Sequence, residues 1–269
     1  MSVSTPSAKE LFGDRYDVRH SSFAQWRALT GRIVRTMALK GELIVAVLTP
    51  LVMTLAFYLP LRYVMEAQGI DYAQYVMPII VLQTMALTMM SNAQLAAFES
   101  LTGLSTRLQT MPIGSLVPLM SRICAGLVRS VVSLIATMVY GYLIGFEFSG
   151  GWAQALAFCG FALAVGVVLT LGADALGSLT KNPEALSQAL TLPILIFGMM
   201  STGFVPESSF PSWARPFARN QPISQFAQTL SDMAAGHLSW AGTWVSLVWL
   251  CGAAVLFLPL AVWASVRRS

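Results

Sequence analysis

The chain has 269 residues, of which 56% are hydrophobic and only 10% are charged, with a formal net charge of +4 and a mean hydropathy of +0.67. Soluble domains carry about 25% charged residues, so this composition excludes a water-soluble globular protein and predicts an integral membrane protein. The apolar runs are about 20 residues long and do not alternate, which favours spanning helices over the ~10-residue strands of a barrel. All three cysteines lie in apolar runs and the two histidines lie far apart, so we expect no disulfide and no metal site.

The first 40 residues are mostly polar and show no signal-peptide pattern. We expect a flexible cytoplasmic N-terminus over residues 1–20 and an amphipathic helix over residues 21–41. Such a helix lies in the cytoplasmic interface with its arginines among anionic headgroups, and the alternative is a soluble helix packed on a partner. The apolar side of this helix holds Phe23, Trp26, Leu29, Ile33, Val34 and Met37. The basic side holds Arg27, Arg32 and Arg35.

About six membrane spans are expected between residues 43 and 266, because a bilayer requires ~20 apolar residues for each. With both termini on one side, that side holds 13 of the 16 Lys and Arg residues, and Arg62, Arg215 and Arg219 lie on the other. The bias of basic residues toward the cytoplasm then predicts a plasma-membrane protein with cytoplasmic N- and C-termini, the latter at residues 267–269. The predicted spans are 43–63, 76–98, 123–146, 152–176, 185–205 and 241–266.

The loop between the second and third spans faces the cytoplasm and runs from Phe98 to Arg122. It is long for a structureless connection, which favours a function over an ordinary linker. A short amphipathic helix beginning at Leu101 would offer an apolar face to a soluble partner. Its candidate contact residues are Leu101, Leu104, Arg107, Leu108 and Met111.

The candidate functional ionisable residues within the predicted spans are Arg129 in the third and Asp174 in the fourth. The connection between these spans is only five residues long, so the spans form an antiparallel hairpin in which Arg129 and Asp174 can pair. The pair is either a functional element or a structural one, with Arg129 reaching the interface and Asp174 paired locally.

An extracytoplasmic segment follows the fifth span and carries prolines at 211, 216 and 222. Proline is favoured in the first turn of a helix, so we expect two short helices, at 211–220 and 222–235, the second ended by Gly236. Two such helices cannot cross a bilayer, and they predict a re-entrant hairpin over about 205–236; a solvated loop is the alternative. The candidate exit-gate residues are Trp213, Arg215, Phe217, Arg219, Asn220, Gln221 and Phe226.

Motifs for covalent chemistry are missing from the sequence. The string GSLTKNPE lacks the glycine that a phosphate-binding loop needs before its lysine, and there is no nucleophile elbow and no HExxH motif. We therefore expect no enzymatic activity and no cofactor in this chain.

Three segments resemble ABC-2 type permeases of the daunorubicin-resistance family, and more narrowly the mycobacterial DrrB-type permeases of phthiocerol dimycocerosate and doxorubicin export. These segments read MPIGSLVPLMSR, NPEALSQALTLPILIFGMMSTGFVP and FPSWARPFARNQPISQF. The resemblance implies an all-α polytopic membrane fold over residues 43–266, with an interface helix, a coupling helix at about 101–111 and an outer re-entrant hairpin.

The resemblance also implies partners. ATP and Mg would be bound by separate DrrA-like ATP-binding subunits, and the membrane partner would be a DrrC-like second permease or a second copy of this chain. Membrane lipids and a hydrophobic substrate are further expected partners, and nucleic acid is not. The expected function is export of a complex lipid or an anthracycline-type drug. The alternatives are an ATP-independent scaffold or channel-like subunit, and a membrane-embedded lipid-modifying enzyme.

Overall fold

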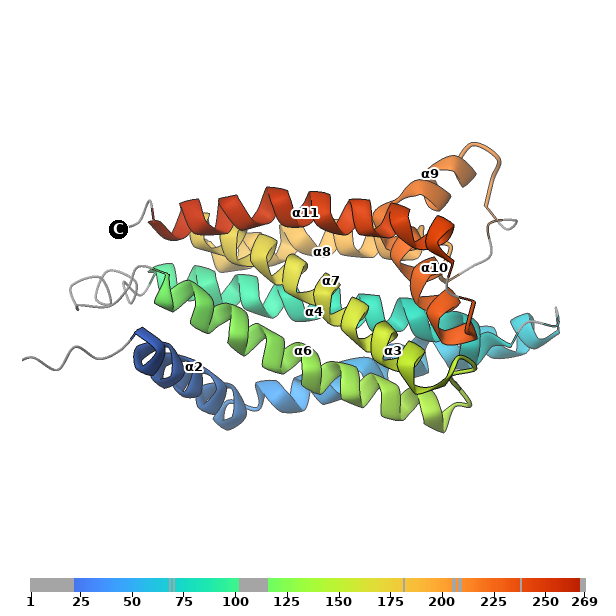
Figure 1. Cartoon of the computed structure of the whole chain (residues 1–269), viewed down its shortest axis with the longest axis horizontal. Helices are drawn as coiled ribbons and strands as arrows, with labels where there is room; N and C mark the ends of the chain where they lie inside the picture. Colours follow the sequence, from blue (N-terminus) through green and yellow to red (C-terminus); the bar gives the residue numbers. More distant parts are fainter. Residues whose placement is uncertain are drawn as a thin grey trace, which may run out of the picture.

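The protein is an elongated bundle of helices, seen in a computed structural model that describes residues 22–67, 69, 71–101, 116–180, 182–204, 207, 210–237 and 239–266 (Figure 1). Within these residues every regular element is helical. In chain order the helices are α2 (Ser22–Leu39), α3 (Glu42–Glu66), α4 (Tyr72–Leu101), α6 (Val117–Leu143), α7 (Gly151–Leu179), α8 (Pro183–Met199), α9 (Arg215–Asn220), α10 (Pro222–Ala235) and α11 (Trp240–Val266).

Five of these helices, α3, α4, α6, α7 and α11, are long and apolar enough to cross a membrane. Helix α2 and the end of α11 lie at one end of the bundle, here called the inner end, and α9 and α10 lie at the other, the outer end (Figure 1). The inner end is the one predicted to face the cytoplasm. The helical membrane class expected from the sequence is therefore confirmed.

Helix α8 is apolar but shorter than the predicted span over residues 185–205. Its 17 residues measure about 25 Å, less than the ~30 Å hydrocarbon core of a bilayer. It ends at Met199 because the following residues bond to α10: the Ser201 and Ser224 hydroxyls lie 3.1 Å apart, and the Thr202 N–H donates to Ser224 Oγ over 3.1 Å. Six crossings and a re-entrant hairpin stay predictions.

Helix α4 forms the centre of the bundle and contacts α3, α6, α7, α8 and α10. Its sequence supplies mainly aliphatic residues in the outer half, where they join a core with aromatic side chains of α7 and of the connection between α6 and α7, including Phe158 and Phe146. Toward the inner end the facing residues become small, with Ala93 and Ala97 buried against Ala173 of α7. Small side chains let two helices approach closely in a membrane.

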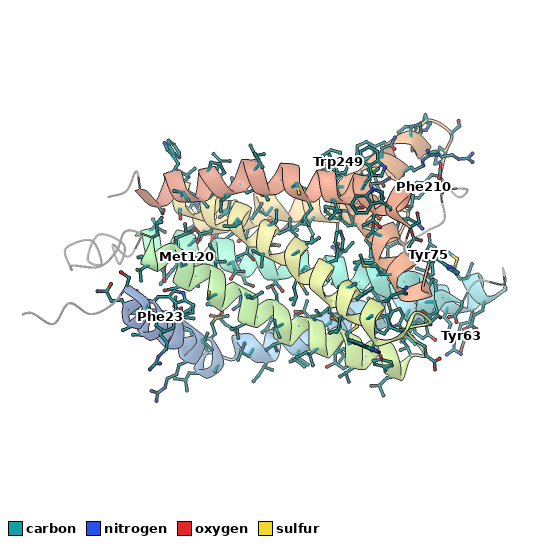
Figure 2. The ribbon with its side chains drawn as sticks, viewed as in Figure 1. Phe23, Tyr63, Tyr75, Met120, Phe210 and Trp249 are labelled. Atoms are coloured by element: carbon teal, nitrogen blue, oxygen red, sulfur yellow. The ribbon has the colours of Figure 1, made fainter. Side chains whose placement is uncertain are left out.

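Large aromatic side chains are exposed at the outer ends of several helices, as in the aromatic belts of membrane proteins. Trp152 is the second residue of α7, Trp240 begins α11 and Tyr63 lies near the end of α3, and all three are exposed. Figure 2 shows Tyr63 at the outer end, opposite Phe23 and Met120 at the inner end. This placement marks the two ends of the bundle as the regions that meet the lipid headgroups.

Helix α2 carries the amphipathic pattern expected over residues 21–41, but its apolar side faces protein. It packs on α6 and α3, with Met37 buried and Trp26, Leu29 and Ile33 half-buried, whereas Phe23 stays exposed. The three arginines at 27, 32 and 35 are exposed on the outward side. Its apolar stripe therefore covers the inner part of α6, and its location in the membrane interface stays a prediction.

The contact between α4 and α7 leaves no space at Gly177, and this generates a stability prediction. A Cβ atom at Gly177 would lie 2.3 Å from the Ala93 carbonyl oxygen and 2.9 Å from Ala96 Cβ, so one of the two helices would have to shift. We expect Gly177→Ala to lower the free energy of unfolding by about 1–3 kcal/mol, as overpacking does. Thermal unfolding of the detergent-solubilised chain measures this.

Gly160 is the matched control, because it lies on the same helix and a Cβ atom there would meet nothing within 4 Å. Gly160→Ala is expected to leave the melting temperature unchanged or raise it slightly, since alanine is the better helix former by up to ~1 kcal/mol. Equal effects at the two glycines would contradict the close approach of α4 and α7.

Candidate functional site

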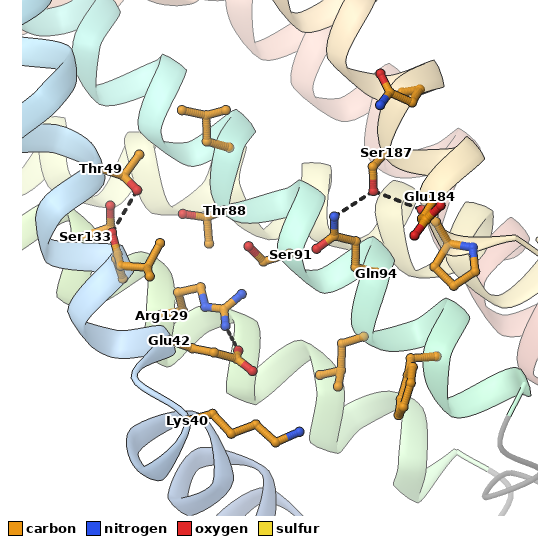
Figure 3. A pocket seen from close by; sticks show the side chains of 17 residues that line it. Lys40, Glu42, Thr49, Thr88, Ser91, Gln94, Arg129, Ser133, Glu184 and Ser187 are labelled. Carbon is orange, nitrogen blue, oxygen red and sulfur yellow. Dashed lines mark hydrogen bonds and ion pairs between the residues drawn. The ribbon is translucent and has the colours of Figure 1, made fainter.

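A cavity of about 640 Å³ lies between α3, α4, α6 and α8 at the inner end of the bundle (Figure 3). Its size falls within the roughly 300–1,000 Å³ of small-molecule sites. The lining includes apolar side chains, hydroxyl and amide groups, and four charged residues. They are Lys40, Glu42, Val45, Ala46, Thr49, Leu87, Thr88, Ser91, Gln94, Leu95, Phe98, Arg129, Ser133, Pro183, Glu184, Ser187 and Gln188.

The charged centre of the cavity is an ion pair between Arg129 of α6 and Glu42 of α3. Arg129 is only 5% exposed, and its Nη2 donates to a Glu42 carboxylate oxygen. Its Nε is buried and has no hydrogen-bond partner. The Glu42 side chain is 35% exposed. A fully buried cation is thus matched by one carboxylate at the rim, which leaves part of the guanidinium unsatisfied.

Local sequence explains why Glu42 reaches this position. Gly41 adopts a φ of 75°, a left-handed conformation that glycine reaches without the penalty of a Cβ atom. The chain can therefore turn from α2 directly into α3, and Glu42 becomes the first residue of α3. A carboxylate in the first turn is stabilised by the helix dipole. Sequence reasoning missed Glu42, because it lies just outside the apolar run that defined the first span.

Several of the hydroxyl and amide groups that line the cavity have hydrogen-bond partners within the protein. Thr49 and Thr88 donate to backbone carbonyls one turn earlier, over 2.8 and 2.9 Å. Gln94 Nε2 donates to Ser187 Oγ over 2.6 Å and joins α4 to α8, as Figure 3 shows. These groups make the wall polar without leaving hydrogen bonds to be filled, in contrast to the Arg129 guanidinium.

A second buried ion cluster lies near the inner end, and it corrects the predicted Arg129–Asp174 pair. Asp174 of α7 pairs with Arg122, with Nε–Oδ1 and Nη2–Oδ2 distances of 2.5 and 3.0 Å, and Arg122 Nη1 lies 3.3 Å from Glu99 Oε2 of α4. The three side chains are 12%, 3% and 15% exposed for Arg122, Asp174 and Glu99.

The error was one of register along an antiparallel helix pair. Arg122 lies five residues after the start of α6, and Asp174 lies five residues before the end of α7, so the two side chains are level. Arg129 lies seven residues further along α6, about 10 Å deeper into the bundle. The hairpin could be predicted from the sequence. Identifying the residue opposite Asp174 also requires knowing where the two helices begin and end.

The predicted coupling helix lies mostly outside the described residues. Leu101 ends α4 and is exposed, while Leu104, Arg107, Leu108 and Met111 fall in the undescribed range 102–115. Glu99 and Arg122, however, stand on either side of that range and belong to the ion cluster that joins the inner ends of α4, α6 and α7. The sequence signal for it was the pair of opposite charges flanking the loop.

Breaking this cluster should destabilise the bundle, because Arg122→Gln leaves two carboxylates buried without their cation. Removing one partner of a buried ion pair costs about 3–5 kcal/mol. We expect a clear drop in melting temperature, measured by size exclusion after heating the solubilised chain. Adding Asp174→Asn should restore part of the loss, since it removes a charge left unpaired.

The control is Arg62→Gln, which removes an arginine from the exposed pair between Arg62 and Glu66 on α3. Exposed ion pairs contribute little to stability, so the melting temperature should not move. If Arg122→Gln behaves like Arg62→Gln, the buried cluster is not a structural requirement of the bundle.

The outer segment forms two helices as expected, although the first is shorter than predicted. It begins at Arg215 rather than Pro211, because Pro211 instead opens a turn in which the Ala214 N–H donates to its carbonyl over 2.9 Å. Helix α10 has the predicted bounds: Pro222 begins it, and Gly236, with a φ of 83°, ends it. Asn220 ends α9, and Gln221 at the junction is buried and donates to the Phe197 carbonyl over 3.2 Å.

The three aromatic residues proposed for an exit gate occupy different environments. Trp213 is 78% exposed, and Phe217 is exposed but stacks on Phe197 of α8, with ring centroids 6.1 Å apart. Phe226 is only 8% exposed and meets Phe161 of α7 edge to face at 5.8 Å. Phe226 therefore belongs to the core and does not form one seal with the other two.

Helix α9 extends away from the bundle at its outer end, whereas α10 is held along its length (Figure 1). The Thr229 hydroxyl lies 2.7 Å from that of Ser246 on α11, and Gln154 Nε2 of α7 donates to the Gly236 carbonyl over 3.3 Å. Arg215 and Arg219 of α9 are both exposed, and Arg215 Nε donates to the Phe210 carbonyl over 2.9 Å. A gating role for this segment stays a prediction.

These helices define a multi-pass membrane protein with a partly polar cavity at its inner end. Residues 57–263 match the ABC-2 family transporter protein model, which covers well over half of the chain. The chain therefore belongs to the ABC-2 transporter family, and the family resemblance expected from its sequence segments is confirmed.

Three relatives are transporter permeases. The chain is 36% identical over 246 residues to the doxorubicin resistance ABC transporter permease protein DrrB of Mycobacterium tuberculosis, covering 86% of this chain and 85% of that protein. It is 26% identical over 242 residues to the daunorubicin resistance permease DrrB1 of Streptomyces coeruleorubidus, covering 87% and 82%. The probable doxorubicin resistance permease DrrC of M. tuberculosis is 29% identical over 162 residues, covering 60% and 58%.

Proposed function

We propose that this chain is the membrane subunit of an ATP-driven exporter that moves a hydrophobic substrate, a complex lipid such as phthiocerol dimycocerosate or an anthracycline-type drug, outward across the plasma membrane. The observation that carries the proposal is the cavity of about 640 Å³ between α3, α4, α6 and α8 at the inner end. The relatives are named for resistance to doxorubicin and daunorubicin, which supports a drug of the anthracycline type as one substrate. The chain performs no nucleotide chemistry itself; ATP and Mg act on DrrA-like subunits.

The arrangement of the bundle supports an inward-facing state. At the inner end the cavity separates α3 from α8, and at the outer end aromatic and aliphatic side chains fill the space between the helices, among them Tyr72, Met77 and Leu230. An exporter that alternates between two arrangements must open this outer core and close the inner cavity. The second permease, a DrrC-like chain or another copy of this one, would complete the pathway.

The buried cluster of Glu99, Arg122 and Asp174 would carry the motion of the ATPase into the bundle. Glu99 and Arg122 border the proposed coupling helix and connect the inner ends of α4, α6 and α7. Closure of the ATPase subunits on bound ATP would push on residues 101–111, and the cluster would make the three helix ends respond together.

Filling the cavity should block transport without disturbing assembly. Ser91 lines the cavity and is partly exposed to it, so Ser91→Trp would occupy the space that the substrate needs. We expect ATP-driven doxorubicin uptake into inside-out vesicles that contain the assembled transporter to fall at least tenfold, while the amount of ATPase subunit that co-purifies is unchanged.

Val255→Trp is the control, because Val255 is 73% exposed on α11 and lies outside the cavity. It should transport like the unchanged protein. Equal transport by the Ser91→Trp and Val255→Trp variants would refute the cavity as a substrate site, and ATP-independent transport in the unchanged protein would refute the exporter.

The coupling role of residues 101–111 has its own test. Leu104→Asp combined with Leu108→Asp removes two apolar contacts worth roughly 3–6 kcal/mol gross, before the ordering cost of binding. We expect the ATPase subunit to dissociate or its substrate-stimulated activity to be lost, while the permease stays inserted. The conservative double change to methionine should retain both properties. Co-purification unaffected by the aspartates would place the docking site elsewhere.

A further inference from the structure

We propose that the inner cavity binds the anionic head group of an acyl-chain lipid, a carboxylate or a phosphate, with Arg129 as its principal contact. The inference rests on the proposed function and goes beyond it: among hydrophobic ligands it names an acidic lipid as the one that Arg129 selects, whereas a neutral lipid or a cationic anthracycline would occupy the same cavity through its apolar walls alone. Three observations support it: the missing hydrogen-bond partner of the buried Arg129, the depth of its positive charge in the cavity, and the apolar residues that line the cavity.

The first argument is the incomplete satisfaction of Arg129. A guanidinium carries five N–H donors and stays charged at every physiological pH. Here it is 5% exposed, bonds to Glu42 through Nη2 and leaves Nε buried without a partner. A buried donor without a partner is costly, and a carboxylate or phosphate oxygen is the acceptor that a guanidinium binds most strongly. Thr49, Thr88 and Gln94, which also line the cavity, already donate within the protein, which lowers their competition for that acceptor.

The second argument is that the most deeply buried charge of the cavity is positive, whereas the rim carries both signs. Glu42 keeps a side-chain exposure of 35%, and Glu184 in the first turn of α8 is exposed. Lys40 also lies at the rim, next to Glu42 in the chain, so the rim carries both signs (Figure 3). Since burial strengthens electrostatic interactions, the deep cation governs selectivity, and an anion gains more than a cation of the same shape.

The third argument is the route for an apolar tail. Apolar residues of three helices share the cavity with Arg129, namely Val45 on α3, and Leu87, Leu95 and Phe98 on α4, opposite the start of α8 at Pro183. Helices α3 and α8 both pack on α4, and the cavity lies between them. Val45 and Phe98 line the cavity, and each is still 59% exposed. A lipid can therefore place its head group at Arg129 while its chain lies against apolar surface that faces the bilayer.

Binding to the full-length chain in phosphatidylcholine nanodiscs tests the inference without any ATPase. The probes are radiolabelled palmitate at about pH 8, where a carboxylate is ionised, its neutral methyl ester, and cationic hexadecylamine. Dioleoyl phosphatidic acid in the nanodisc is a competing second arm that separates a phospholipid source from a fatty-acid source. We expect palmitate to bind more tightly than the ester or the amine, and phosphatidic acid to compete with it.

Two substitutions should change palmitate affinity in opposite directions. Arg129→Gln removes the contact and should weaken binding about tenfold or more, the effect of losing one charge-assisted hydrogen bond. Glu42→Gln removes the carboxylate that already occupies Arg129 and should strengthen binding severalfold. A salt bridge with a purely structural role predicts weaker binding for both. Arg62→Gln, at an exposed pair distant from the cavity, is the control and should leave the affinity unchanged.

Each outcome decides the inference. Equal binding of palmitate and its methyl ester, preferred binding of hexadecylamine, or unchanged or weaker palmitate binding in Glu42→Gln would overturn it. If the Arg129→Gln variant does not fold, palmitate binding by the Glu42→Gln variant still tests the inference. If binding does not depend on the charge of the probe but ATP-driven export persists, the head-group inference is rejected and the proposed function is kept. If binding selects the anionic probe but ATP-driven export is absent, only the proposed function is rejected.

Discussion

A charge buried among membrane helices has no water to solvate it, so its partner must come from the protein or from a ligand. Two arginines of α6 meet this constraint in different ways. Arg122 reaches two carboxylates and is held on both sides. Arg129, deeper in the bundle, reaches one carboxylate from the rim and keeps a donor without a partner. The Arg122 cluster joins three helices, whereas the Arg129–Glu42 pair leaves a buried donor in the cavity.

The two arginines also divide the inner half of the protein by role. The Arg122 cluster ties together the ends of α4, α6 and α7, which are the helices next to the segment that would receive force from an ATPase. The Arg129 pair ties α6 to α3, one wall of the cavity. Because α6 carries both, a displacement at its inner end would be felt at the cavity through the same helix. The proposed reception of force and the proposed binding of a ligand would thus lie on the same helix.

Much of the fold could be predicted because it depends on local sequence. Long apolar runs placed five spans near the observed helices, and Pro222 with Gly236 bounded α10 correctly. The misses depend on contacts between distant residues. Helix α8 stops at Met199 because Ser201 bonds to Ser224 on α10, although the apolar run continues beyond it. Nothing local shows that bond.

The site was harder to predict than the fold for the same reason. Which carboxylate faces which arginine depends on how far one helix slides along another, and a shift of two turns exchanges Arg122 for Arg129. Glu42 was overlooked because its importance comes from Gly41 and from a partner 87 residues away. The burial of Phe226 likewise follows from its contact with Phe161, which its neighbours in the exposed outer segment do not indicate.

The close contact at Gly177 determines which helices are able to move. With Ala93 directly against the Gly177 backbone, α4 and α7 have no clearance to slide past each other, and α10 is bonded to α7 and α11 at the outer end. Helices α4 and α7 would therefore move as one body. Helices α3 and α8 each lean on α4 and flank the cavity between them. A transport cycle in this bundle would therefore displace α3 and α8 relative to the joined pair of α4 and α7, rather than slide α4 along α7.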